Sequence, residues 1–181
     1  MMASLLTRSM HDLSAAAWFG GSLMGAVGLN GAAAEAKDSR DRTRLSSVGW
    51  KKWAPVQTAA FAVHAVGGIG LILDNKSRLV SERGEPETTI VKAVLTLAGM
   101  GATYYSWTLG KKVDKLANEG GEGATEPRPG ASKELADAQK QLKMLQWALP
   151  AFSGAVVVLG AKEGELQRPE SLFSRVRLNC R

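Results

Sequence analysis

Hydrophobic positions in this chain are gathered into four long runs that contain no Asp, Glu, Lys or Arg. The runs cover residues 13–34, 53–73, 93–110 and 144–161. Each run reaches the roughly 18–20 residues that an α-helix needs to cross the hydrocarbon core of a bilayer. The pattern predicts an all-α fold, an integral membrane four-helix bundle, with the whole chain as one multi-pass domain in the cell membrane. The predicted spans are about 12–34, 53–73, 90–112 and 144–161.

All the charge lies outside the runs, and the segments between them predict how the helices are connected. Residues 35–52 are expected to form a charged connector, after which a helix starts near Trp53 with Pro55 in its first turn. Glycines and prolines predict a flexible loop at 118–132. Ser132 is then expected to cap the last helix.

Composition and charge exclude several classes of protein. The formal net charge is +6, from 23 Lys and Arg against 17 Asp and Glu. The basic residues, including a basic tail at 171–181, lie beside the apolar runs, which indicates contact with the anionic headgroups of the lipid bilayer and argues against nucleic acid as a partner. The apolar runs argue against a soluble globular enzyme, and the lone Cys180 excludes an internal disulfide.

The basic residues and the tryptophans also predict sidedness. Four spans place both termini and the second connector on one face of the membrane, and the opposite face has 13 Lys and Arg against 10. The positive-inside rule therefore favours both termini outside the cell. Interfacial anchoring agrees with this threading, because four tryptophans fall at the more basic face: Trp50, Trp53, Trp107 and Trp147. As an alternative, the first helix is a cleaved signal peptide that ends at Ala32-Ala33-Ala34.

Small residues recur at four-residue spacing on the predicted helices. This spacing places them on one face, where they let a second helix approach closely enough for backbone van der Waals contact. The second helix is either in the same bundle, in another copy of the chain or in another membrane subunit. The expected packing positions are Ala17, Gly21, Gly25, Gly68, Ala98 and Ala102.

Histidine offers the main candidate for chemistry within the spans. His64 lies at the centre of the second predicted span, where an ionisable side chain is costly and marks a candidate functional site. It is a candidate haem or metal ligand, a candidate proton relay, or a group that hydrogen-bonds a neighbouring helix. The expected hydrogen-bond partners are Thr96, Thr103, Tyr104 and Ser153.

His11, a candidate metal ligand, stands just before the first predicted span. At 1.5 Å per residue it is expected roughly 19 Å from the bilayer midplane, whereas His64 lies near that midplane. The two histidines of one chain are therefore expected not to share a metal ion or a haem.

The sequence has no P-loop, no CxxC and no HExxH motif. The favoured function is a non-enzymatic membrane protein without a cofactor, a structural or accessory component of a membrane assembly or a homo-oligomer. One alternative is a haem- or copper-handling membrane protein that uses His64. Another is a small transporter or channel subunit lined by His64, Tyr104 and Tyr105.

The run HDLSAAAWFGGSLMG, from His11 to Gly25, resembles the start of small uncharacterised four-helix membrane proteins of actinobacteria. It is also similar to the first helix of copper-resistance D-type membrane domains, which often opens with a histidine followed by an aromatic residue and paired glycines. The second resemblance implies that the protein handles copper, with His11 as the candidate residue for that role. The resemblance covers about 15 of the 181 residues.

Overall fold

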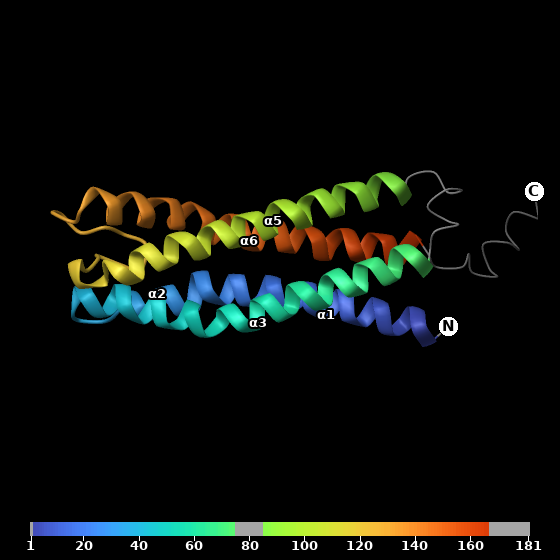
Figure 1. The fold of residues 1–181 in the computed structure, drawn as a ribbon, viewed down its shortest axis with the longest axis horizontal. Helices are drawn as coiled ribbons and strands as arrows, with labels where there is room; N and C mark the ends of the chain where they lie inside the picture. The colour runs from blue at the N-terminus through green and yellow to red at the C-terminus, as the bar shows by residue number, and fades with distance from the viewer. Residues whose placement is uncertain (1, 75–84, 167–181) are drawn as a thin grey trace, which may run out of the picture.

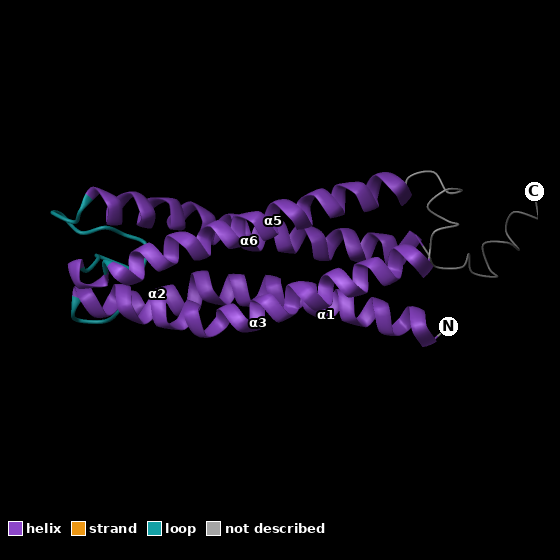
Figure 2. Cartoon of the chain, in the orientation of Figure 1, coloured by secondary structure: helices purple, strands orange, loops and turns teal. Residues whose placement is uncertain are grey.

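Four long helices lie side by side in the computed structural model, which describes residues 2–74 and 85–166 (Figure 1). The first helix has three consecutive parts, with a π-helical turn in its middle: α1 (Met2–Met24), η1 (Gly25–Leu29) and α2 (Asn30–Ala34). The others are α3 (Ser39–Asp74), α5 (Glu85–Lys115) and α6 (Lys133–Leu166), with a 3₁₀ turn η2 (Ala117–Glu119) after α5. The described part of the chain is therefore almost entirely helical, which confirms the all-α fold class (Figure 2).

The first connector is much shorter than predicted. Only residues 35–38 separate α2 from α3, and residues 39–52, predicted as connector, belong to α3. These residues include no proline, so nothing in the backbone prevents the helix from starting early. Pro55 therefore lies inside α3 rather than in its first turn, at the cost of one backbone hydrogen bond.

The first helix and α3 form an antiparallel hairpin, and two contacts define its register. Gly21 lies against the ring of Trp53 at one level, and Thr7 Oγ1 donates a hydrogen bond to Asp74 at another. The charge-free run of α3 lies between these two contacts. It therefore lies beside the residues from about Thr7 to Gly21, whereas the charge-free run of the first helix, residues 13–34, is centred about ten residues nearer the turn.

The four helices do not pack evenly. The first helix packs against α3 and α6, and α5 packs against α6, whereas the contact between α3 and α5 is the weakest between neighbouring long helices. At the centre, Trp18 and Val156 are fully buried and pack with Phe61 and Leu95. The ring of Trp18 meets that of Phe61 edge to face, with centroids 5.0 Å apart.

A second core cluster joins α5 to the first half of α6. It consists of Leu109, Val113, Leu135 and Ala138. The backbone N–H of Leu135 donates to Ser132 Oγ, which confirms Ser132 as the residue that caps α6.

The segment 118–132 connects η2 to α6. Gly120 adopts a positive φ of 75°, the backbone N–H of Gly121 donates to the Ser39 carbonyl, and Thr125 is buried. The segment therefore folds back onto the start of α3, while its flexibility stays a prediction. The predicted basic tail, 171–181, lies outside the described residues.

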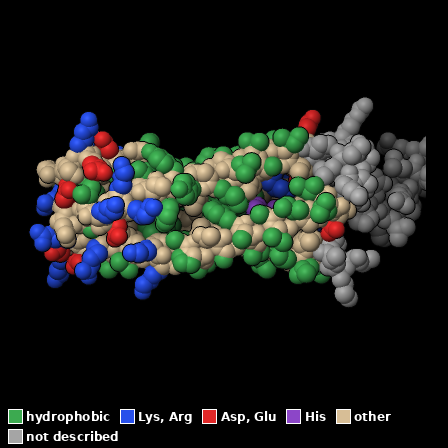
Figure 3. Space-filling view, in the orientation of Figure 1, with side chains coloured by type: hydrophobic (Ala, Val, Ile, Leu, Met, Phe, Trp, Pro, Cys, Tyr) green, Lys and Arg blue, Asp and Glu red, His purple; other side chains and the backbone are tan. Residues whose placement is uncertain are grey.

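Charged side chains gather at the end of the bundle where residues 35–38 and the segment before α6 connect the helices (Figure 3). We call it the connector end, or charged end. Over the remaining described surface of this face, hydrophobic side chains are interspersed with backbone and other side chains. By length and composition, α3 and α6 are two helices that could cross a membrane. Only 22% and 28% of the residues in their most apolar stretches are buried. A core helix of a soluble protein is mostly buried, so the apolar faces of these two helices are unusually uncovered.

Candidate functional site

Two histidines that lie far apart in the sequence stack inside the bundle. The ring centroids of His11 and His64 are 4.1 Å apart, with 33° between the ring planes. Each histidine lies about 26 residues from Lys37 in the turn, so the antiparallel hairpin brings both to one level. The expectation that His11 lies far from His64 is wrong, because the first helix begins at Met2 and His11 is well inside it.

Hydrogen bonds fix the orientation of both imidazole rings. His11 Nδ1 lies 2.9 Å from Asp12 Oδ1, and His64 Nδ1 lies 3.2 Å from the His11 carbonyl oxygen and 3.4 Å from Ser14 Oγ. Because a carboxylate and a carbonyl only accept, each Nδ1 carries the proton and donates it. In the neutral rings, both Nε2 atoms are then free acceptors.

The hydrogen bonds of His64 therefore run to the first helix and to none of the four partners expected from the sequence. Thr103 Oγ1 and Ser153 Oγ donate instead to carbonyls of their own helices. The sequence alone does carry a signal for the pairing, because positions equally distant from a helical turn meet in an antiparallel hairpin.

A largely buried ion pair lies beside the histidines. Lys92 of α5 donates to Glu163 Oε2 of α6, and the two side chains are only 12% and 14% exposed. Thr89 Oγ1 donates to the other oxygen of the Glu163 carboxylate at 3.0 Å. The Lys92 ammonium also interacts electrostatically with His64 and with Asp12.

Two more charged side chains, Arg8 and Asp12 of the first helix, lie close to α6. Arg8 Nη1 lies 3.3 Å from the position that a Cβ at Gly164 would take, and Asp12 Oδ1 lies 3.8 Å from the same position at Gly160. These two glycines leave the space that the charged side chains occupy. We call the following residues the polar cluster: Arg8, His11, Asp12, His64, Lys92 and Glu163.

Sequence reasoning missed the four charged members of this cluster because each lies just outside a charge-free run. The packing register of all four helices brings them level with His64.

Gly67 sets the distance between α1 and α3 at the histidine pair. A Cβ there would lie 2.7 Å from the His11 nitrogen and 2.9 Å from the Thr7 carbonyl oxygen, both of them backbone atoms. A Cβ added at the predicted packing residue, Gly68, would make only ordinary contact with the His11 ring, at 3.5 Å. The closest approach of the two helices is thus one residue earlier than predicted.

The other predicted packing residues have mixed surroundings. Gly21 and Gly25 face the rings of Trp53 and Trp50, so they accommodate tryptophans rather than a second backbone. Ala17 and Ala102 are half-buried and Ala98 is exposed. On α5 it is Gly99, next to Ala98, that leaves space for the Trp18 ring.

The histidine pair does not form a ready metal site. Among residues 2–74 and 85–166, no group of three or more His, Cys, Asp or Glu side chains is arranged to hold a metal ion. A metal ion bonded to both Nε2 atoms at about 2.0 Å holds the ring centroids roughly 5–6 Å apart, farther than the observed 4.1 Å. Binding of one metal ion or one haem iron by both rings therefore requires the rings to separate.

The tyrosines proposed to line a pathway lie on the outside. Tyr104 is 66% exposed and Tyr105 is 47% exposed, and the Tyr105 hydroxyl donates to Gln141 of α6. Neither ring lines the interior with His64, so the arrangement does not favour the transporter or channel hypothesis.

Comparisons with family models, with curated proteins and with solved structures give no match for this chain. The resemblance of the run from His11 to Gly25 stays an interpretation of the sequence. The function is therefore argued from the geometry of the molecule alone.

Proposed function

We propose that the chain is a multi-pass membrane protein whose four helices all cross the bilayer of the cell membrane. The supporting observation is a band of uncovered apolar side chains to which every helix contributes. In water, contiguous exposed apolar surface of this extent is unfavourable, whereas contact with lipid tails removes it from water. Members of the band include Leu6, Leu13, Val66, Ile69, Val94, Leu97 and Val158.

The proposed bilayer position leaves the connector end in water. α3 has 36 residues and is therefore about 54 Å long, which exceeds the roughly 30 Å of hydrocarbon. The charged half of α3 thus projects beyond the lipid. The Lys111 ammonium lies 3.5 Å from the centre of the Trp107 ring, a pairing suited to the headgroup level. The positive-inside rule places this end in the cytoplasm.

Within the membrane we propose a non-enzymatic role, as a structural or accessory component of a larger assembly or of a homo-oligomer. The support comes from small residues that face outward. Around Gly20 of α1 and Gly101 of α5, an added Cβ would meet nothing within 4 Å. Ala16 and Ala98 are exposed near them, so each helix offers a shallow outer face that another membrane helix can approach closely.

Native mass spectrometry of the chain released from mild detergent tests this role. We expect a homo-oligomer or a copurifying membrane subunit. Gly20→Leu or Gly101→Leu should weaken the association by filling the shallow face. Gly110→Leu is the matched control, because its surroundings are equally open but it lies next to Lys111 at the charged end. A strictly monomeric chain with no partner would contradict the role.

One observation favours a second candidate, a haem- or copper-handling protein. Metal-ligating histidines usually donate the other ring N–H to a carboxylate or a backbone carbonyl, and His11 and His64 both do so. The accessory role predicts a purified protein with no Soret band and no bound copper. A Soret band, or stoichiometric copper, that disappears in His64→Phe would move the assignment to the second candidate.

A further inference from the structure

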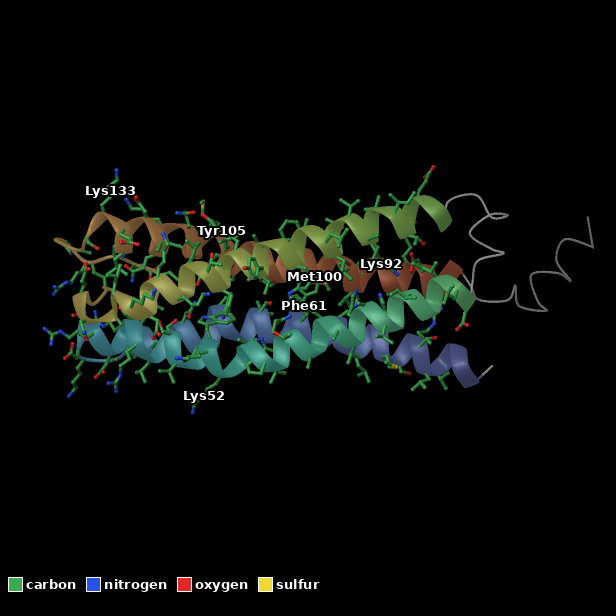
Figure 4. The ribbon with its side chains drawn as sticks, in the orientation of Figure 1. Lys52, Phe61, Lys92, Met100, Tyr105 and Lys133 are labelled. Atoms are coloured by element: carbon green, nitrogen blue, oxygen red, sulfur yellow. The ribbon has the colours of Figure 1, made fainter. Side chains whose placement is uncertain are left out.

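The bundle is hollowed on the side where α3 and α5 face each other. Their contact is the weakest between neighbouring long helices, and a lysine and a histidine are visible there between rows of hydrophobic side chains (Figure 3). Phe61 of α3 and Met100 and Lys92 of α5 all lie in the space between the two ribbons (Figure 4). We call this place, with His64 beneath it, the α3–α5 opening.

The opening contains hydrogen-bonding capacity that the described residues do not use. An ammonium group has three N–H donors, and the only hydrogen bond of Lys92 within residues 2–74 and 85–166 runs to Glu163. The Nε2 atoms of His11 and His64 make no hydrogen bond to the described part of the chain. The same place therefore offers a strong donor and two acceptors.

The charge of the opening selects the kind of ligand. Glu163 neutralises Lys92, and the charges of Asp12 and Arg8 oppose each other, so the surroundings are balanced rather than basic. An anionic phosphate would have to enter beside a buried carboxylate, which is unfavourable. A neutral oxygen suits the Lys92 donor better.

The walls of the opening suit a flat apolar body. Phe61 presents an aromatic ring whose edge-to-face partner, Trp18, is fully buried, and Met100 presents a polarisable thioether. Aromatic rings and thioethers both pack favourably against planar rings. A ligand here combines a planar ring with an oxygen at its edge.

We propose that the α3–α5 opening binds the ring of a lipid-soluble quinone-class molecule. Its carbonyl oxygen accepts an N–H of Lys92, and the hydroxyl of its reduced form donates to a free Nε2 of the histidine pair. The inference rests on the proposed membrane location, because the ligand reaches the opening from the lipid between α3 and α5.

Equilibrium binding of menadione to the full chain in phosphatidylcholine nanodiscs tests the proposal, with empty nanodiscs as the background. We expect saturable binding of one menadione per chain. The comparator is 2-methylnaphthalene, which keeps the methylated ring system but has no carbonyl. It should bind at least about tenfold more weakly, because it leaves the donor of Lys92 without an acceptor.

A double variant checks which group holds the carbonyl. Lys92→Met with Glu163→Leu removes the ion pair as a unit and keeps the volume. It should lower menadione affinity at least about tenfold and leave that of 2-methylnaphthalene unchanged. The matched control is Lys112→Met with Glu134→Leu, which removes an exposed ion pair at the charged end and should change neither affinity.

Each other outcome overturns a definite part of the account. A chain that does not enter nanodiscs contradicts the membrane location and the ligand together. If the chain enters but binds the two probes equally, or if the double variant still binds menadione, only the quinone assignment is wrong. Displacement of menadione by phosphatidylglycerol would show that the opening takes an anionic headgroup instead.

Discussion

Replacing Lys92 with methionine is expected to destabilise the bundle by about 3–5 kcal/mol, because the Glu163 carboxylate is left buried without its cation. Among the described residues, Thr89 would then be the remaining hydrogen-bond donor to that carboxylate. Adding Glu163→Leu to the same chain removes the unpaired charge, so the double variant should regain most of the lost stability. Thermal unfolding in detergent measures both effects.

The control for this prediction is an exposed ion pair. Lys112 and Glu134 lie 3.7 Å apart with side chains 56% and 61% exposed, so Lys112→Met should cost no more than about 1 kcal/mol. Equal losses for Lys92→Met and Lys112→Met would mean that the Lys92–Glu163 pair is solvated rather than buried.

Replacing Gly67 with alanine is expected to destabilise the contact between α1 and α3 by about 1–3 kcal/mol, the usual range for overpacking. The new Cβ would meet two backbone atoms of α1, at His11 and at Thr7, and backbone cannot move aside as a flexible side chain can. The helices must separate, which also disturbs the histidine stack. Unfolding by heat or by a denaturing detergent measures the change.

Gly110→Ala is the matched control for that substitution. It makes the same chemical change inside a helix, but nothing lies within 4 Å of the new Cβ. Helix propensity alone then favours alanine by up to about 1 kcal/mol. Similar losses at both positions would contradict the close approach of α1 and α3.

The sequence predicted the helices well because their signal is local. Charge-free runs marked where long helices lie, and the expected cap at Ser132 is confirmed. The charge-free run of the first helix is offset from that of α3 for an equally local reason. Its head contains Arg8 and Asp12, so the absence of charge pointed to a window nearer the turn.

The polar cluster was only half predictable because it depends on register between helices. His64 stood out as an ionisable residue in an apolar run, but its partner His11 becomes visible only when the chain is folded about the turn at 35–38. The contacts of Gly21 and Gly25 also depend on the register between the first helix and α3. A four-residue spacing predicts that something approaches closely, and register decides that it is a tryptophan ring.

The contact of the apolar band with lipid is tested most directly by spin labels at its surface. Single cysteines at Val66 and Leu97, which are 58% and 70% exposed, would be labelled in a Cys180→Ser chain reconstituted in liposomes. A cysteine at the exposed Lys133 of the charged end gives the aqueous reference. The account predicts that oxygen relaxes the labels at Val66 and Leu97 more than a water-soluble nickel complex does, with the reverse at Lys133. Greater relaxation by the nickel complex at all three positions would contradict it.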